Sequence, residues 1–265
     1  MSLGGGDGDL SMTALLAAVT GLLVGSFLTV VIDRVPRGAS IVAPGSACSG
    51  CHRRLRPIEL VPVLSWLLQH GKCRRCGVAI GVEAVVVEIV TALLFVVMMW
   101  HFERPIVGAA HCVLVAGLVA LTAIDFRTKR LPREITYTTI AVGTPLLTIA
   151  ALVIEEPRRV PTALLGAFIA TVIMLVLYTV SRGGLGDGDV RLSPLLGLYL
   201  GWSNPGLSLV GLFYGFIIGS VAGVALMITG RAGRRTALPF GPFLAMGTLV
   251  ALLQGQSFID VVMAR

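Results

Sequence analysis

Residues 161–190 read PTALLGAFIATVIMLVLYTVSRGGLGDGDV, an apolar run followed by a glycine-rich segment that contains Asp187 and Asp189. A helix needs roughly 20 apolar residues to cross the hydrocarbon core of a bilayer, and this run supplies them. Carboxylates beside such a run are costly to bury, so they usually face water, a charged partner or a reacting group. The stretch therefore predicts a membrane helix with a functional or ion-paired acidic segment at its end.

The composition extends this interpretation to the whole chain. Apolar residues make up 55% of the sequence and charged residues only 13%, about half the charge of an ordinary soluble domain. We expect an all-α polytopic membrane protein with about eight transmembrane helices, of which the sixth is short. The expected segments are residues 13–32, 84–100, 106–124, 135–154, 161–180, 192–202, 206–229 and 241–263. Seven spans with a re-entrant piece at 192–202 are the alternative.

The distribution of Lys and Arg indicates an orientation. No Lys or Arg precedes the first apolar segment, which favours an uncleaved anchor with its N-terminus outside. Alternating the loops from there puts 17 of the 21 Lys and Arg residues on the cytosolic side, in agreement with the positive-inside rule. Topology and contact with anionic membrane lipids explain the net charge of +7, so no nucleic-acid partner is expected.

One loop, residues 34–82, is long enough to fold by itself. The position of this loop predicts that the chain has three parts: an N-terminal transmembrane helix at 1–33, a cytosolic domain at 34–82 and a transmembrane domain at 83–265. By the orientation above, this loop lies in the cytosol.

The loop carries two C-x-x-C pairs, whose members are Cys48, Cys51, Cys73 and Cys76. Two such pairs at this spacing are typical of a tetrahedral zinc site, which would be structural because four thiolates leave no open position. Two disulfides or free thiols are the alternatives, and the reducing cytosol disfavours the disulfides. His52 and His70 lie near the cysteine pairs and could replace one of the cysteine ligands. We expect both to be solvated loop side chains. Cys112, alone in the third apolar segment, is expected to pack as a small apolar residue.

A third aspartate, Asp125, ends another apolar run, on the same expected side of the membrane as Asp189. Two carboxylates beside one water cannot both ionise cheaply. One then holds a proton, while the other accepts a proton from a water that attacks an amide carbonyl. Gly186 and Gly188 would let a peptide backbone approach Asp189 closely. The pattern predicts an aspartic protease site with Asp125 and Asp189 as its catalytic pair.

Less specific interpretations of the same acids stay open. Either Asp187 or Asp189 could serve as a helix cap, and Asp125 could pair with Arg127 or Lys129 at the interface. Arg182 and Arg191 could likewise make Asp187 or Asp189 part of an ion pair or of an ion pathway, so a polytopic transporter is the alternative function. Protease carboxylates must share one water, whereas ion-pathway acids can lie far apart, and this separation distinguishes the two functions.

Several further segments occur in a fixed order along residues 21 to about 250. They are Gly25-Ser-Phe-Leu-Thr-Val-Val-Ile-Asp-Arg-Val-Pro36, the two cysteine pairs, Pro62-Val-Leu-Ser-Trp-Leu, Ile124-Asp-Phe, Leu131-Pro-Arg-Glu-Ile-Thr, Gly186-Asp-Gly-Asp189-Val-Arg and Pro239-Phe-Gly-Pro-Phe-Leu-Ala245. Together they resemble the type IV prepilin peptidase family, whose members are polytopic aspartic proteases of the GxGD type.

The resemblance implies that Asp125 and Asp189 are catalytic and that Asp187 occupies a variable position. It implies that the substrate is a prepilin or pseudopilin of a type IV pilus or protein secretion system. Cleavage of its leader would occur on the cytosolic side of the bacterial cytoplasmic (inner) membrane. Pro239, Gly241 and Pro242 would help to position the extended peptide, with ordinary helix entry as the alternative.

The resemblance also implies a second activity, N-methylation of the new N-terminus with S-adenosylmethionine by the cytosolic domain. The sequence departs from the family pattern at Thr29, where asparagine is common, and around residues 56–59 and 81–85. Glu59 and Glu88 could bind the cofactor or the substrate, although solvated or interfacial carboxylates are the simpler expectation.

Overall fold

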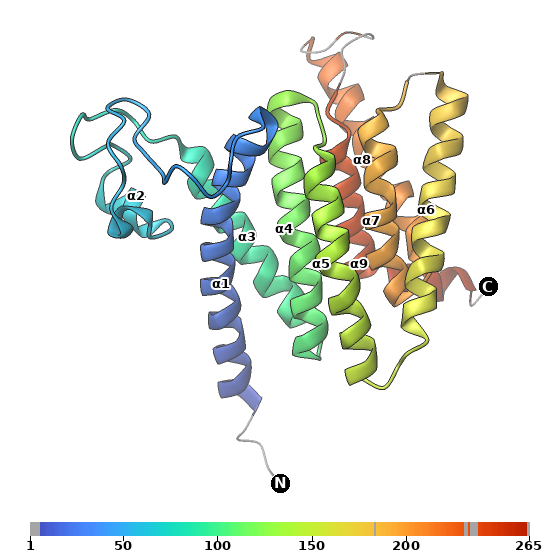
Figure 1. Ribbon diagram of the computed structural model, residues 1–265. Coiled ribbons are helices and arrows are strands. Elements are labelled where there is room, and N and C mark those ends of the chain that lie inside the picture. The colour runs from blue at the N-terminus through green and yellow to red at the C-terminus, as the bar shows by residue number, and fades with distance from the viewer. Residues whose placement is uncertain (1–5, 183, 231–232, 234–237, 264–265) are drawn as a thin grey trace. The chain divides into compact units, whose positions relative to one another are not determined.

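The structure is a computed structural model that describes residues 6–182, 184–230, 233 and 238–263, with no side-chain description for 6–11 and 255–263. Its described residues form helices and no β-strand, apart from two isolated β-bridges (Figure 1). In chain order the elements are α1 (Gly6–Arg34), η1 (Val35–Arg37), η2 (Pro57–Leu60), α2 (Leu64–Leu68), α3 (Val82–His101), α4 (Pro105–Thr128), α5 (Arg133–Val153), α6 (Arg159–Ser181), α7 (Asp187–Ser203), α8 (Leu207–Ile228) and α9 (Gly241–Met263).

Eight long helices lie where the eight apolar segments predicted them. Within the described residues, six are long and apolar enough to cross a membrane: α1, α3, α4, α5, α6 and α8. Helix α7 has 17 residues, and the apolar part of α9, Gly241–Gln254, is also short. The all-α membrane fold is confirmed, whereas the count of eight spans is not.

The chain forms two compact units, Met1–Ala123 and Ile124–Arg265, divided within α4. We call them unit 1 and unit 2. The expected division at residues 33 and 82 stays a prediction. The orientation rests partly on the start of the chain and on Arg231, Arg234, Arg235 and Arg265, which lie outside the described residues.

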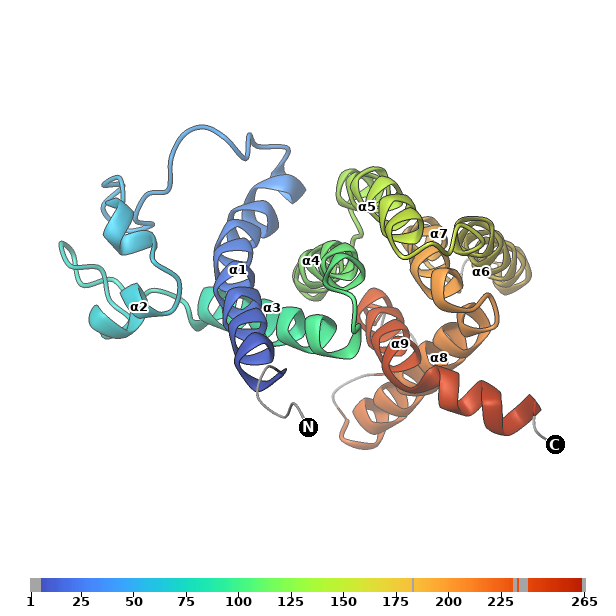
Figure 2. The ribbon, with the colours of Figure 1, turned by 90° about the horizontal axis from the view of Figure 1, so that it is seen from below.

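In unit 1, α1 packs against α3 and crosses it (Figure 2). Gly21 and Gly25 make this close approach, because a Cβ on Gly25 would lie 2.6 Å from the Cα of Glu88 and one on Gly21 would lie 2.5 Å from the Cα of Ala92. Small residues at a helix contact are the usual device for close packing in lipid. The cysteine-bearing loop connects these two helices.

In unit 2, α7 is the central helix and contacts α5, α6, α8 and α9 (Figure 2). Eleven of its residues are buried, and a Cβ on Gly201 would lie 2.7 Å from the Cα of Gly166 on α6. Because neighbouring helices surround α7, it does not need the length or the lipid-facing apolar surface of an outer helix. This explains why its apolar segment is short.

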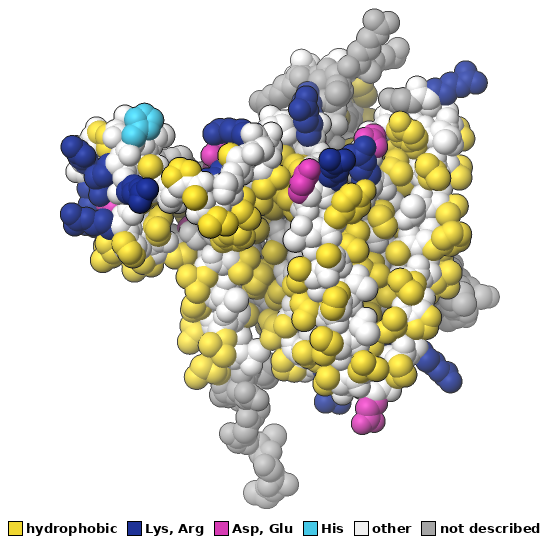
Figure 3. All heavy atoms as spheres, viewed as in Figure 1, with side chains coloured by type: hydrophobic (Ala, Val, Ile, Leu, Met, Phe, Trp, Pro, Cys, Tyr) yellow, Lys and Arg dark blue, Asp and Glu magenta, His cyan; other side chains and the backbone are white. Residues whose placement is uncertain are grey.

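The outer helices of unit 2 expose apolar side chains along their length. On α6, exposed residues include Leu164, Phe168, Leu175 and Val180. On the face of unit 2 in Figure 3, hydrophobic side chains cover the sides of the helices and charged side chains gather at their ends. This is the pattern of helices that contact lipid on their flanks and water at their ends.

Candidate functional site

Asp125 lies in the last turns of α4, within unit 2, and is 4% exposed. Its Oδ2 accepts a hydrogen bond of 3.0 Å from the backbone amide of Gly241, the first residue of α9. A backbone donor to a carboxylate both orients the group and satisfies one of its oxygens. The start of α9 thus holds the acid at the end of α4.

Asp189 lies in the first turn of α7 and is 6% exposed. The N-cap of α7 is Gly186, so neither Asp187 nor Asp189 is the capping residue. Among the described residues, Oδ1 of Asp189 is buried and has no hydrogen-bond partner. A buried carboxylate oxygen without a partner is costly, which indicates a place for water or a ligand.

The two aspartates line one cavity of about 780 Å³. Their carboxyl groups lie close enough for their charges to interact. The full set of lining residues is Asp125, Lys129, Arg130, Leu131, Gly184, Leu185, Gly186, Asp187, Gly188, Asp189, Arg191, Phe216, Leu238, Pro239 and Phe240. The structure therefore brings Asp125 to the glycine-rich segment, as the sequence predicted.

Asp187 has a different environment from Asp189. Its side chain is 60% exposed and forms an ion pair of 2.6 Å with Arg191, one turn along α7. The ion-pair interpretation is thus correct for Asp187. The alternative pairing of Asp125 with Arg127 or Lys129 stays a prediction.

The glycines of the acidic segment make room for side chains of the site itself. A Cβ on Gly186 would lie 2.8 Å from Oδ2 of Asp189, and one on Gly188 would lie 3.0 Å from the Cβ of Leu131. Both distances are shorter than an ordinary contact. The expected role of these glycines in admitting a peptide stays a prediction.

The expected positioning residues of the segment 239–242 lie differently with respect to the cavity. Pro239 lines it, Gly241 donates to Asp125, and Pro242 is buried and is not among the lining residues. Phe240, within the same segment, also lines the cavity, whereas sequence reasoning missed the apolar side chains of Leu131 and Phe216. Leu131 stands in a quoted motif, but nothing in the sequence distinguishes Phe216 from the other apolar residues of α8.

The four cysteines of unit 1 form one cluster. Their Sγ atoms all lie within 4.8 Å of one another, and those of Cys48 and Cys76 are 3.7 Å apart. A tetrahedral zinc ion with Zn–S bonds of about 2.3 Å requires sulfur atoms roughly 3.8 Å apart. All four thiols are free, so the disulfide alternative is not adopted. The donor set fits a four-thiolate metal site.

Two similar turns present these thiols. The amide of Cys48 donates to the carbonyl of Arg53 and that of Cys73 to the carbonyl of Val78, each at 2.9 Å. His52 and Gly77 hold equivalent left-handed positions, with φ of 53° and 71°. His52 and His70 are exposed turn residues outside the cysteine cluster.

Backbone amides favour the thiolate form of Cys73, whereas burial and the neighbouring thiols raise the pKa of Cys76 to about 11. The amides of Cys76 and Arg75 lower the pKa of Cys73 to about 6. Since metal ligands must be deprotonated, amide groups directed at the sulfur favour metal binding.

Glu59 and Glu88 are buried, at 8% and 6% exposure, so neither is a solvated carboxylate, whereas an interfacial position stays a prediction. Glu59 accepts from Arg53 at 2.6 Å and from the amide of Arg56 at 2.8 Å. Glu88 accepts from the amide of Val63 at 2.7 Å. Both line a smaller pocket of unit 1.

These features define a class of protein: a polytopic α-helical membrane protein that holds two buried aspartates at helix ends beside one cavity, with a four-cysteine cluster in a separate loop. Comparison with protein families is specific. Residues 112–228 match the family described as "Type IV leader peptidase family", and residues 19–102 match the one described as "Bacterial Peptidase A24 N-terminal domain". The chain belongs to the type IV leader peptidase family.

Curated relatives span nearly the whole chain. The prepilin leader peptidase/N-methyltransferase of Bacillus subtilis is 34% identical over 91% of this chain and 94% of its own length. The protein of the same name from Pseudomonas aeruginosa is 31% identical over 91% of this chain and 90% of its own length. That from Myxococcus xanthus is 37% identical over 84% of this chain and 66% of its own length. No solved structure matches the chain.

Proposed function

We propose that this protein is an aspartic endopeptidase that cleaves the leader peptide of type IV prepilins or pseudopilins, with Asp125 and Asp189 as its catalytic pair. The observation that carries the proposal is the shared cavity. Two buried aspartates from different helices line it, and one oxygen of Asp189 has no hydrogen-bond partner among the described residues. Family membership and the names of the relatives support the same activity.

The proposed mechanism follows from the chemistry of two neighbouring carboxyl groups. One carboxyl group keeps a proton because two adjacent negative charges repel each other. The ionised partner takes a proton from a water molecule, whose oxygen attacks the scissile carbonyl, while the protonated acid donates to the carbonyl oxygen. The free oxygen of Asp189 is a suitable acceptor for that water.

The common cavity also bears on the transporter alternative. Acids that carry ions across a membrane can be spaced along the path, whereas acids that share a water must face the same space. Asp125 and Asp189 line one cavity, which favours hydrolysis.

Cleavage assays of Asp125→Asn and Asp189→Asn with a candidate prepilin test the proposal. Each variant should lose cleavage while remaining folded, because an amide can neither accept the proton of the water nor share a proton with its partner. Asp187→Asn is the matched control, since Asp187 forms an exposed ion pair on the same turn of α7. Full activity of either of the first two variants would reject the catalytic pair.

We further propose that the cysteine cluster holds a structural zinc ion. Cys48, Cys51, Cys73 and Cys76 supply four thiolates at a spacing that fits tetrahedral coordination. Zinc there would stabilise a loop that has little apolar core, without taking part in hydrolysis.

The name of the relatives supports a second activity, N-methylation of the N-terminal amine that cleavage exposes. The methyl donor would be S-adenosylmethionine, bound by unit 1, which contains the cysteine loop. Transfer of labelled methyl from S-adenosylmethionine to cleaved pilin tests this activity. Competent cleavage without transfer would leave a peptidase only.

The proposed location is the bacterial inner membrane. The N-terminus would lie outside, and the cysteine loop and Asp125 and Asp189 would lie at the cytosolic face, in contact with anionic lipids. Cysteine labelling of exposed positions in intact cells and in inverted vesicles distinguishes the two orientations.

A further inference from the structure

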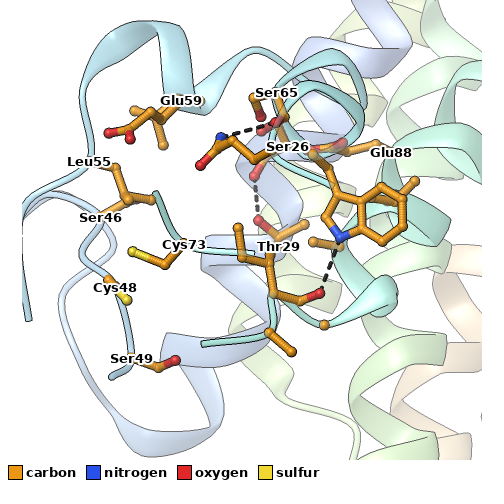
Figure 4. Close-up of a pocket in the computed structure, with 18 of the residues that line it drawn as sticks. Ser26, Thr29, Ser46, Cys48, Ser49, Leu55, Glu59, Ser65, Cys73 and Glu88 are labelled. Atoms are coloured by element: carbon orange, nitrogen blue, oxygen red, sulfur yellow. Dashed lines mark hydrogen bonds between the residues drawn. The ribbon is translucent and has the colours of Figure 1, made fainter. Parts of the chain in front are cut away.

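A second cavity, of about 310 Å³, lies in unit 1 between the cysteine loop and helices α1 and α3 (Figure 4). Ser26 and Thr29 of α1, Glu88 of α3, and Glu59 and Ser65 of the loop are among its lining residues. The volume is at the lower end of the range of about 300–1,000 Å³ typical of small-molecule sites. The cavity shares no lining residue with the aspartate site of unit 2.

Two carboxylates give this pocket a negative lining. Its lining includes Glu59 and Glu88, and none of the described lining residues is Lys, Arg or His. Glu59 has its own cation, because Arg53 donates to it at 2.6 Å from outside the pocket. Glu88 is held by the neutral amide of Val63 at 2.7 Å. A buried carboxylate is costly without an opposite charge, so Glu88 favours a ligand that brings one.

The remaining walls suit a ligand with an apolar body. Leu55, Val63, Trp66 and Ile80 contribute apolar and aromatic surface. The indole N–H of Trp66 is already used, since it donates to the carbonyl of Ile80 at 3.1 Å. What Trp66 can offer a ligand is therefore its ring, and aromatic rings attract organic cations.

Hydroxyl groups complete the recognition surface. Thr29 donates its hydroxyl proton to the carbonyl of Ser26 at 2.7 Å, which leaves its oxygen lone pairs as acceptors. Ser26, Ser46, Ser49 and Ser65 also line the pocket. These groups can bind the polar atoms of a ligand around its charged centre.

We propose that this pocket binds an organic cation whose positive charge faces Glu88. The inference rests on the methyl transfer proposed above, and it assigns the sulfonium group of S-adenosylmethionine to Glu88. The ligand combines a positive sulfonium with an adenosyl group. These match a pocket with an apolar, aromatic wall and with one carboxylate, Glu88, that forms no ion pair among the described residues.

Binding of two nearly isosteric ligands to the full-length, detergent-solubilised protein tests the inference. S-adenosylmethionine carries the sulfonium charge, whereas S-adenosylhomocysteine has a neutral thioether at that position. Glu88→Gln should weaken the binding of S-adenosylmethionine about tenfold or more, because the substitution removes a charge interaction in a partly buried site. The affinity for S-adenosylhomocysteine should change by less than about threefold, because this ligand has no sulfonium charge to face Glu88.

Glu83→Gln is the matched control. Glu83 is an exposed acid in the first turn of α3 and is not among the pocket-lining residues, so both affinities should stay as in the unmodified protein. An unchanged affinity of Glu88→Gln for S-adenosylmethionine would overturn the inference. So would equal losses for both ligands, since Glu88 would then act only through its bond to Val63.

Leader cleavage, which uses the site in unit 2, reports independently on folding. If Glu88→Gln loses cleavage as well, Thr29→Met provides the second test, because it fills the pocket from α1 without changing Glu88 or Val63. It should abolish binding of S-adenosylmethionine and keep cleavage, and retained binding would overturn the inference.

An unmodified protein that cleaves prepilin but does not bind S-adenosylmethionine would refute the pocket assignment alone. An unmodified protein that binds the ligand but fails to cleave would reject the proposed peptidase and support the pocket assignment.

Discussion

The backbone amide of Gly241 donates a hydrogen bond of 3.0 Å to Oδ2 of Asp125, which joins the first residue of α9 to the last turns of α4. The bond occupies one carboxylate oxygen and so limits the rotation of the group. Gly241 is buried, and its missing side chain is what lets the amide approach. A substitution at this position should disturb the candidate catalytic acid without altering its chemistry.

Gly241→Ala should lower kcat/KM for leader cleavage by about tenfold or more, the loss expected when a hydrogen bond to a charged group is weakened. A Cβ at this position would lie 2.9 Å from Oδ2 of Asp125 and 3.0 Å from Cδ2 of Leu131. Steady-state cleavage of a prepilin in detergent measures the effect. Gly223→Ala is the control, because a Cβ there would meet only Leu238, at 3.4 Å. Equal activity of the two variants would show that the Gly241 contact does not position Asp125.

Gly188 and Leu131 should be energetically coupled. A Cβ on Gly188 would lie 3.0 Å from the Cβ, 3.3 Å from Cδ1 and 3.5 Å from Cγ of Leu131, so Gly188→Ala forces Leu131 to move. We expect Gly188→Ala to lower cleavage several-fold, and Leu131→Ala to relieve part of that loss because it removes two of the three close atoms.

A double-mutant cycle on kcat/KM measures this coupling. The expected interaction energy is about 0.5–3 kcal/mol, the range for residues in contact. Strictly additive effects of the two substitutions would mean that Leu131 adapts to the new Cβ without an energetic cost. The loss of activity in Gly188→Ala would then have a cause other than contact with Leu131.

The sequence was sufficient to predict the helices and the two aspartates that the fold brings to one cavity. Long apolar runs need no tertiary information, because length and hydropathy alone define a membrane helix. Asp125 and Asp189 were predictable because acids at the ends of such runs are rare. The central place of α7 was less accessible, since a short apolar segment has the same composition whether lipid or other helices surround it.

The burial of Glu59 and Glu88 could not be predicted. Arg53 and Val63 are their partners, and only the folded loop brings Val63 to a carboxylate that lies 25 residues later. Loop sequences carry little periodicity, so the contacts that bury a charged group are set by tertiary structure. The same holds for Phe216, which lines the aspartate cavity from α8.

Removing one cysteine ligand should release the metal. Cys73→Ser should reduce bound zinc from about one ion per chain to little or none and increase proteolysis of the loop, because three thiolates hold zinc less tightly than four. Zinc analysis after dialysis measures the content. Cys112→Ser is the control, since Cys112 is buried in α4 outside the cluster. Equal zinc content in both variants would reject the four-cysteine site.

The ion pair between Glu59 and Arg53 should make the loop more stable at neutral than at acid pH. The hydrogen bond from Arg53, followed by the one from the amide of Arg56, lowers the pKa of Glu59 below its ordinary value of 4.5. A carboxyl group whose pKa is lowered by folding stabilises the folded state above its ordinary pKa. That contribution falls as the pH drops through the lowered value.

Glu59→Gln should therefore destabilise the loop at pH 7. Its difference from the unmodified protein should begin to shrink below the ordinary pKa of 4.5, where the glutamate of the unfolded loop takes up a proton, and should be lost as the pH falls through the lowered pKa of the folded loop. Hydrogen exchange of the loop amides, corrected for the intrinsic rate at each pH, measures the difference. Loss of the proposed zinc ion in acid would affect both proteins and cancel in the comparison. Glu83→Gln, which changes an exposed acid of α3, should show no such trend. A difference between Glu59→Gln and the unmodified protein that stays constant from pH 7 to pH 3 would mean that the Arg53 pair does not stabilise the loop through its charge.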